Sequence, residues 1–310
     1  MIDLRRLKVL RAVAHYGTVT AAARALHFTP SAASQQIRRL GQELGVELLE
    51  PDGRNVRLTA AARSLLTHAD EIEARWERAE AELRSLADRP TGSLRVSGFP
   101  TAVAALLSPM AAALRRTHPG LTVELREDQE HTSRDSFDLL FAGEVDLAVT
   151  AAVPGNPPTS DARFEQRPLL DDPFDLVVPA DHPLADRPDA SLAQAATEPW
   201  ILPPVDSSCR VHTLSACSAA GFTPHVVHHA VESHAVAHLV AQRLGVALVP
   251  RLAPLPPQVP VRRVACAGTP TRKLLTCTRA GGHAQPAIAA AVAELHRAAA
   301  TVSAGASVAA

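Results

Sequence analysis

Residues 17–44 read GTVTAAARALHFTPSAASQQIRRLGQEL and carry the strongest local signals in the chain. Thr18 is placed to cap a helix whose small alanine side chains allow another helix to pack closely. Thr29 and Pro30 then begin a further helix, because threonine caps well and proline fits the first helical position, where no amide donor is needed. The stretch therefore predicts two helices joined by a short turn, with Phe28 filling the gap between them.

The helix that begins at Pro30 has two different faces. Its apolar face consists of Ala33, Ile37, Leu40 and Leu44. The other face consists of Ser31, Ser34, Gln35, Arg38 and Gln42. Hydroxyl, amide and guanidinium groups at helical spacing suit base edges and phosphates in a DNA major groove. A solvated helix face is the alternative, but such faces usually carry Glu and Lys, and neither occurs here before Glu43. The predicted DNA contacts come from Thr29, Ser31, Ala32, Ser34, Gln35 and Arg38.

The flanking residues extend this unit on both sides. Upstream, the apolar positions Leu4, Leu7, Leu10 and Val13 indicate a first helix that begins after Asp3 and stops at Gly17. Downstream, Asp52-Gly53 between short apolar runs is a strong hairpin signal. A hairpin after such a helix is a wing, which places Arg54 where it reaches a minor groove and Arg57 near phosphate. A plain surface turn is the alternative.

The charges are unevenly divided along the chain. Residues 1–58 hold nine Lys/Arg and five Asp/Glu, although the net charge of the whole chain is −1. A basic head on an acidic body suits a head that touches a polyanion.

Together these residues resemble the winged helix-turn-helix of LysR-type transcriptional regulators, most closely at residues 17–23, 26–40, 43–50 and 57–59. The resemblance implies a regulator and not an enzyme. It also implies a homodimer or tetramer that binds double-stranded DNA at a pseudo-palindromic operator, with RNA polymerase as a further partner. Two residues depart from the family pattern. Gly41 stands where Glu is usual and is expected to weaken the helix by roughly 1 kcal/mol, and Ala33 stands where Val is usual.

A long helix is predicted from its cap at Thr59 to about Asp88. Its apolar residues step alternately by four and three: Leu65, Ala69, Ile72, Trp76, Ala79, Leu83 and Leu86. This heptad spacing predicts a seam that packs against the same helix of another subunit. Packing on its own head is the alternative. We assign dimerisation to Leu65, Ile72, Trp76 and Leu83.

From Ser93 onward, strands and helices alternate. The first unit has predicted strands at 94–96, 121–125 and 145–149, with helices from Pro100 to Leu114 and at 132–142. The second has strands at 174–179, 199–202, 224–230 and 246–250 and helices at 208–219 and 234–243, followed by a strand at 273–278, a helix at 284–300 and a loose tail at 301–310. This order predicts two Rossmann-like lobes, with the chain crossing twice between them and a cleft at the crossing.

The predicted fold class is therefore α/β in three parts. These are a winged helix-turn-helix at 1–58, a linker helix at 59–89 and a two-lobed effector domain at 90–310, with lobe 1 at about 92–162 and 267–301 and lobe 2 at about 163–266. Residues 168–174, 182–185 and 244–251 resemble the effector domain of the same family, which is like a periplasmic binding protein. Arg243 stands where that family often has Gly, so strain is expected at this turn.

Ligands of such sheets bind beyond the carboxyl ends of strands and near helix N-termini. The effector-binding residues predicted on this basis are Phe99, Pro100, Thr101, Ser207, Ser208, Glu232 and Ser233. Free amides and hydroxyls favour an anion, whereas Glu232 opposes one, so the charge of the effector stays open. The alternative is that Thr101, Ser207 and Ser233 merely cap helices.

No sequence motif for catalysis is present: the chain has no Gly-x-Ser-x-Gly, Gly-x-x-x-x-Gly-Lys or His-Glu-x-x-His. We therefore expect no catalytic residue, no metal and no cofactor apart from a small-molecule effector. The first residues lack the apolar core of a signal peptide, and no apolar run is long enough to span a bilayer. These features predict a cytoplasmic protein, associated with the nucleoid through DNA and not with a membrane.

Two further kinds of chemistry stay open as alternatives. Cys209 and Cys217 are similar to the paired cysteines of peroxide-sensing LysR relatives, but an eight-residue separation on one helix is about 12 Å, too far for a disulfide. His234 and His238 are four residues apart and suit a shared metal. Histidines that are solvated or lie in the core are commoner than metal ligands.

Overall fold

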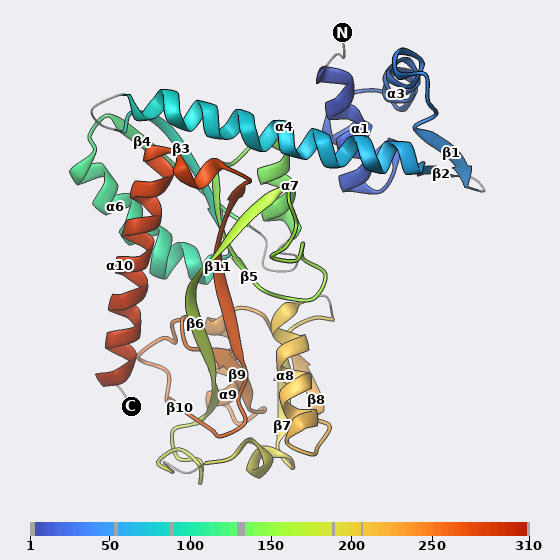
Figure 1. Cartoon of the computed structure of the whole chain (residues 1–310). Coiled ribbons are helices and arrows are strands. Elements are labelled where there is room, and N and C mark those ends of the chain that lie inside the picture. The colour runs from blue at the N-terminus through green and yellow to red at the C-terminus, as the bar shows by residue number, and fades with distance from the viewer. Residues whose placement is uncertain are drawn as a thin grey trace.

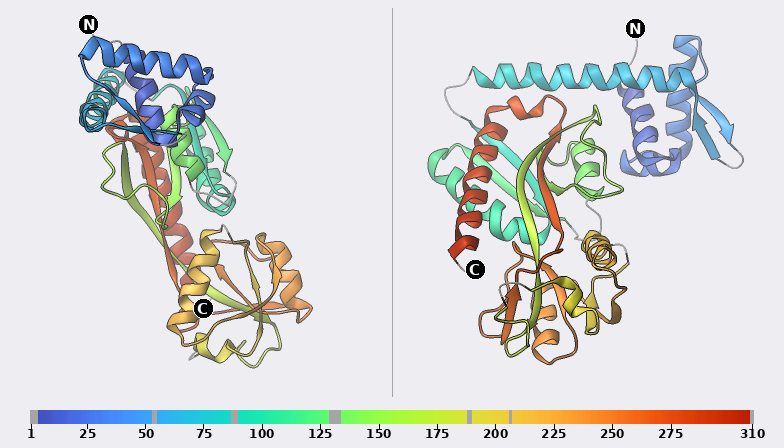
Figure 2. Two further views of the ribbon diagram at one scale, coloured as in Figure 1. Left: turned by 90° about the vertical axis from the view of Figure 1, so that its right-hand side faces the viewer. Right: turned by 60° about the horizontal axis from the view of Figure 1, so that its bottom comes forward.

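The computed structural model describes residues 4–52, 55–86, 90–128, 134–187, 190–205 and 207–308. A long helix, α4 (Ala60–Ser85), carries the N-terminal head at one end and contacts a two-lobed body along the rest of its length (Figure 1). The head and the second lobe lie at opposite ends of the molecule, as the side view also shows (Figure 2).

The head consists of α1 (Leu4–Tyr16), α2 (Val19–Ala25), α3 (Pro30–Leu44) and the hairpin of β1 (Leu49–Asp52) and β2 (Asn55–Leu58). Both predicted caps are confirmed: the Thr18 hydroxyl accepts a hydrogen bond from the amide of Ala21 (3.1 Å), and the Thr29 hydroxyl accepts one from the amide of Ala32 (3.2 Å). The residues that form the core of the head include Leu10, Val13, Ala22, Ala33, Ile37 and Leu40.

Two details of the head differ from expectation. Phe28 does not fill the gap between α2 and α3, because its side chain is 47% exposed. The small residues Ala22, Ala23 and Ala33 already close that gap without it. Gly41, expected only to weaken α3, lies where a Cβ would be 2.6 Å from the carbonyl oxygen of Val46. The tight turn after α3 therefore excludes larger residues at this position.

Helix α4 is capped by Thr59, as predicted, and packs at both ends. Ala62, Leu66 and Ala69 join the core of the head. Farther along, α4 contacts the body at the turn around Gly281, where a Cβ would lie 2.6 Å from the carbonyl oxygen of Ala74. A side chain at position 281 would therefore push the helix away from the body.

Lobe 1 contains the predicted parallel strands β3 (Gly92–Gly98), β4 (Leu121–Glu127) and β5 (Leu147–Ala151), with β3 between the other two. The covering helices are α5 (Pro100–Ala102), one π-helical turn η1 (Val103–Leu107), α6 (Ser108–Thr117), α7 (Arg134–Ala142) and α10 (Pro286–Val308). The loose tail predicted after residue 300 is wrong as far as Val308, because the alanine-rich segment continues α10.

Two long antiparallel strands, β6 (Phe164–Pro179) and β11 (Thr271–Arg279), run through both lobes (Figure 1). They are the two predicted crossings, but β6 begins at Phe164 and not at Phe174. Asp172, in the unexpected part of β6, is buried because its carboxylate accepts a hydrogen bond from Arg272 at 2.8 Å. Strands β6 and β11 join the strands of both lobes into one continuous sheet, in the order β10-β6-β11-β5-β3-β4, with β9 also paired to β6.

Lobe 2 contains β7 (Pro199–Leu202) and β8 (His225–His229), which pair in parallel, and the strands β9 (Ala247–Pro250) and β10 (Val261–Val264). Its helices are η2 (Leu192–Ala195), α8 (Ser208–Ala219) and α9 (Ser233–Ala241), while η3 (Gly282–Ala284) belongs to lobe 1. Strand β10 was not expected from its sequence, VRRV, which has two adjacent arginines. Arg243 has φ 58°, which confirms the left-handed turn expected after α9.

The head also touches lobe 1 directly through His15. Its ring stacks on Phe141 at 4.2 Å between centroids, its Nε2 lies 2.5 Å from Asp138, and its Nδ1 lies 2.9 Å from Nη1 of Arg163. An arginine donates to Nδ1 only when that nitrogen is unprotonated, so these contacts fit a neutral imidazole with its proton on Nε2.

Candidate functional site

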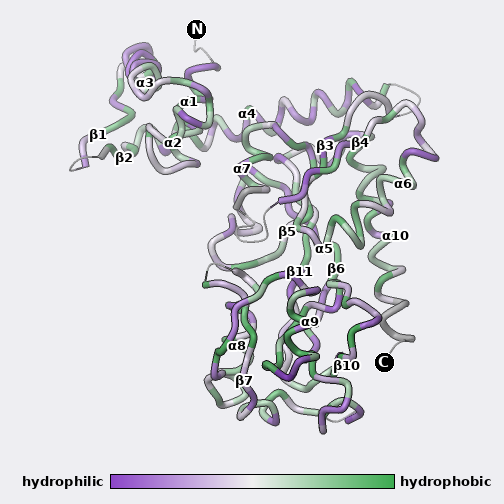
Figure 3. The backbone as a smooth tube through the Cα atoms, turned by 180° about the vertical axis from the view of Figure 1, so that it is seen from behind, coloured by the Kyte–Doolittle hydropathy of each residue, from purple (hydrophilic) through white to green (hydrophobic). Residues whose placement is uncertain are grey.

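The outer face of α3 presents the polar side chains that the sequence singles out. Ser31, Gln35 and Arg38 are exposed and Ser34 is half-buried, while Ala33, Ile37 and Leu40 hold the opposite face in the core. Much of this outer face is hydrophilic (Figure 3). The predicted polar face is thus free to meet a partner surface.

Thr29 and Ala32 form the N-terminus of α3, where the Thr29 hydroxyl lies 3.1 Å from that of Ser31. The hairpin lies beside α3, and within it Arg57 pairs with Glu50 at 2.9 Å. The predicted wing contact, Arg54, lies outside the described residues.

An apolar row runs along α4 on the surface of the molecule. The exposed fractions are 48% for Ile72, 63% for Trp76, 69% for Leu83 and 82% for Leu86. Leu65, at the other end of the row, is half-buried against the head. Packing on the head therefore accounts for one end of the seam and leaves Ile72, Trp76 and Leu83 uncovered.

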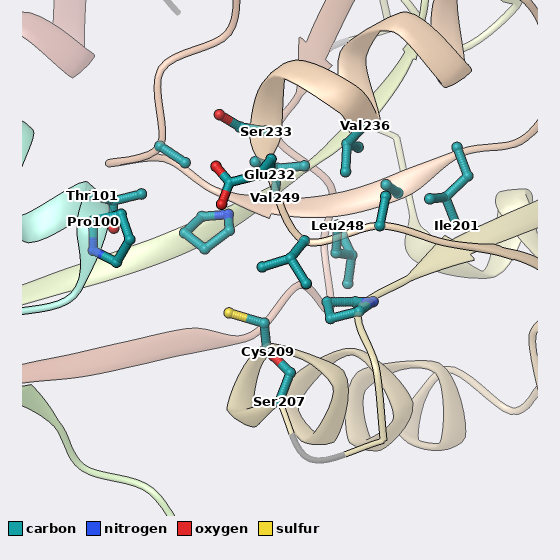
Figure 4. Close-up of a pocket in the computed structure, with 16 residues that line it drawn as sticks. Pro100, Thr101, Ile201, Ser207, Cys209, Glu232, Ser233, Val236, Leu248 and Val249 are labelled. Carbon is teal, nitrogen blue, oxygen red and sulfur yellow. The ribbon is translucent and has the colours of Figure 1, made fainter. Parts of the chain in front are cut away.

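A cavity lies between the two lobes, at the ends of β3, β7 and β8 (Figure 4). Five predicted effector residues line it together: Pro100, Thr101, Ser207, Glu232 and Ser233. Phe99 and Ser208 do not line it. The ring of Phe99 instead packs against the guanidinium of Arg272, 4.8 Å from the ring centroid.

None of the three candidate hydroxyls caps a helix. The Thr101 hydroxyl accepts a hydrogen bond from Nη2 of Arg272 (3.0 Å), and that of Ser233 donates to the carbonyl oxygen of Pro254 (2.7 Å). Ser207 stands at the N-cap position of α8 but makes no capping bond with its side chain. The helix-cap alternative therefore does not explain these residues.

Most of the cavity wall is apolar and was not predicted. It includes Ile201, Pro203, Val231, Val236, Leu248, Val249 and Ala253, together with Cys209. The run Val246–Pro250 indicates a buried strand, but nothing local in it shows that part of the strand faces a cavity. Arg272, which holds Thr101, was also missed, because its partner Asp172 is far away in the sequence.

The two cysteines of α8 are not joined by a disulfide. Cys209 and Cys217 both lie on this single helix. Cys217 is fully buried, and this burial raises the pKa of its thiol to about 11, which keeps it protonated and unreactive. Among the described residues no group of three His, Cys, Asp or Glu side chains is arranged to hold a metal ion.

The ion pair of Arg95 and Asp146 joins the middle of β3 to the residue that directly precedes β5. Burial alone would raise the pKa of Asp146, but hydrogen bonds from the Arg95 side chain and amide, with the charges of Arg95 and Arg279, lower it below its ordinary value. Asp146 therefore remains ionised, and it lies 3.6 Å from Arg279, the arginine that pairs with Glu77 of α4.

A winged helix-turn-helix, a connecting helix and a two-lobed body with a cavity between its lobes define a DNA-binding regulator with a ligand-sensing domain. The comparisons with known proteins agree. Residues 4–63 match the bacterial regulatory helix-turn-helix protein, lysR family, and residues 87–300 match the LysR substrate binding domain. The chain belongs to the LysR family of transcriptional regulators.

Individual relatives are similar over most of the chain. The RuBisCO operon transcriptional regulator of Allochromatium vinosum is 30% identical over 80% of this chain and 79% of its own length. The HTH-type transcriptional regulator AlsR of Bacillus subtilis is 31% identical over 80% of both chains. A solved structure, the Corynebacterium glutamicum OxyR C206 mutant, has the same fold, with TM-score 0.60, 24% identity and coverage of 98% of this chain and 95% of that one.

None of the described helices combines the length and the apolar character needed to span a membrane.

Proposed function

We propose that this regulator reads its operator through the outer face of α3. The supporting observation is that Ser31, Ser34, Gln35 and Arg38 share one surface of a helix whose other side is fixed in the core. Thr29 and Ala32 place the N-terminus of this helix near phosphate, and Arg54 reaches into the minor groove.

The operator is pseudo-palindromic, because two heads related by a dimer axis read two half-sites. The dimer forms through the exposed seam of Ile72, Trp76 and Leu83, with Leu65 at its head-proximal end. Exposed apolar residues in a row of this kind mark a protein interface. A second pairing of dimers gives a tetramer.

The effector binds in the cavity lined by Pro100, Thr101, Ser207, Glu232 and Ser233, while Phe99 and Ser208 are the chain neighbours of Pro100 and Ser207. Effector binding changes the relative arrangement of the two lobes and thereby how the paired heads meet DNA and RNA polymerase.

The chain is divided into a DNA-binding head at 1–58, a linker at 59–89 and an effector domain at 90–310. A protein that acts on the bacterial chromosome works in the cytoplasm, on the nucleoid.

The decisive experiment uses DNA selected by the full-length protein from a random-sequence pool. Ser34→Ala with Gln35→Ala is expected to lower affinity for the selected site by at least about thirtyfold, since each good base contact contributes about 1–3 kcal/mol of discrimination. Gln36→Ala, on another face of α3, is the matched control and leaves affinity within about threefold. Unchanged footprints for the double variant would show that α3 is not the reading helix.

A further inference from the structure

The cavity between the lobes has an unusual distribution of charge. Among the described residues that line it, Glu232 is the one with a charged side chain. Its carboxylate has no hydrogen-bond or ion-pair partner within the part of the chain that the structure describes. Figure 4 shows this carboxylate at the start of α9, on the side of the cavity that faces Pro100 and Thr101. Any molecule in the cavity therefore meets one uncompensated negative charge.

The arginines near the cavity are tied to two buried carboxylates and do not themselves line it. Arg272 pairs with Asp172 at 2.8 Å, and both side chains are almost completely buried. Arg251 and Arg263 both pair with Asp175. An anionic ligand that took Arg272 would leave the buried Asp172 carboxylate without its arginine partner, which is costly.

The helix N-termini do not reverse this balance. Both α8 and α9 begin at the cavity, and helix N-termini favour negative charge. Glu232, however, stands at the N-cap position of α9 and supplies that charge itself. At α8 the Ser207 side chain is 3% exposed and has no hydrogen-bond partner in the described ranges, so it is available to an uncharged polar atom of a ligand.

The rest of the wall determines the shape and polarity of the ligand. It is mainly aliphatic, and the cavity, which is partly open to solvent, is about 50 Å³. For comparison, an apolar cavity of about 150 Å³ holds benzene. As the lobes stand, the cavity therefore suits a short apolar chain, and a bulkier ligand extends towards its open side or moves the lobes apart.

On these observations we propose that the effector of this regulator is a small organic amine, whose ammonium group pairs with Glu232 and whose apolar part lies against Ile201, Val236 and Leu248. This inference rests on the proposed function of the cavity as the effector site. It resolves the charge of the effector, which the sequence left open, in favour of a cation.

The test uses matched probes that differ only in their polar group. Butylamine, butanol and butanoate form one set, and benzylamine, benzyl alcohol and benzoate the other. Binding to the full-length protein is measured by calorimetry at pH 7.5, where the amines are protonated. Each amine is expected to bind at least fivefold more tightly than the carboxylate with the same skeleton.

Two variants test whether the Glu232 carboxylate causes the preference for amines. Glu232→Gln is expected to abolish the preference for amines, whereas Glu124→Gln, which removes an exposed carboxylate on β4, leaves it unchanged. Glu232 is exposed, so its replacement leaves the fold intact, and circular dichroism verifies this. Equal or tighter binding of the carboxylates, an unchanged preference in Glu232→Gln, or no saturable binding by either amine would each overturn the proposal.

One competing cation deserves its own variant. Arg210 of α8 donates to the carbonyl oxygen of Pro203 at 2.9 Å and does not line the cavity. If the carboxylate probes bind more tightly than the amines, and Arg210→Ala abolishes the binding of the carboxylates, the ligand is an anion and the proposal fails. Binding to selected DNA is measured in parallel. If the wild type binds the selected DNA but shows no preference for amines, only the proposed ligand class is refuted. If the wild type shows no specific DNA binding, the proposed function is refuted.

Discussion

Replacing Arg279 with methionine tests how firmly α4 is fastened to the effector domain. The Arg279 side chain donates to the Glu77 carboxylate of α4 and to the carbonyl oxygens of Leu140 (3.2 Å) and Val145 (2.9 Å). Its removal leaves Glu77, which is 8% exposed, with a single hydrogen bond from Gln285 at 3.2 Å within the described residues.

The size of the effect follows from this burial. Removing one partner of a buried ion pair costs about 3–5 kcal/mol, because the other charge stays buried without compensation. The side chains of Arg279 and Glu77 are 19% and 10% exposed, so we expect the lower end, about 3 kcal/mol. For a domain of this size that corresponds to a fall in Tm of roughly 6–12 °C.

Thermal unfolding is followed by calorimetry at equal protein concentrations, because association also shifts Tm. The double variant Glu77→Met with Arg279→Met is expected to recover at least half of the loss. Arg126→Met is the control: its pair with Glu144 is 55% and 54% exposed, and its removal should cost less than about 1 kcal/mol. A loss below about 1 kcal/mol for Arg279→Met, or a double variant no more stable than the single one, would refute this account of the contact.

Two further predictions concern the dimer and the acid stability of lobe 1. Trp76→Glu places a charge in the exposed seam and should raise the dimer dissociation constant at least tenfold by sedimentation velocity; an unchanged molar mass at low concentration would contradict the assigned interface. Because the pKa of Asp146 is lowered in the folded protein, its stabilisation is complete above the ordinary value of 3.8 and is lost as pH falls through the folded value. The Tm difference between wild type and Asp146→Asn should therefore shrink from pH 7 to pH 3, and a constant difference would show that ionisation of Asp146 contributes nothing.

The parts of the fold that depend on local chemistry could be predicted from the sequence. Thr18, Thr29 and Thr59 identify helix starts because a cap is made by residues three positions apart. The helix at 208–219 was predicted with the bounds that the structure shows. Neighbouring residues alone determine these features.

The parts that depend on distant partners could not be predicted. Asp172 looks like a break in a strand until Arg272, a hundred residues later, is placed beside it. The same limit applies to the cavity. The expectation that ligands bind beyond the ends of strands identified Thr101, Ser207 and Glu232. The aliphatic wall could not be predicted in this way, because it depends on the pairing of β9 with β6.

The two long strands connect the cavity mechanically with the DNA-binding half. Arg272, which holds Thr101 at the cavity, and Arg279, which holds Glu77 of α4, lie on the same strand β11, about 23 Å apart at the usual rise per residue. β11 is paired on both sides, by β5 and β6, so it moves as a stiff element. A ligand that favours one arrangement of the lobes thus has a rigid route to the linker helix, provided that it binds that arrangement more tightly than the other. Arg279→Met removes the contact between β11 and Glu77 of α4. Ligand binding should therefore persist, while the effect of the ligand on DNA affinity falls. Equal ligand effects in the variant and the wild type would show that the signal does not pass through β11.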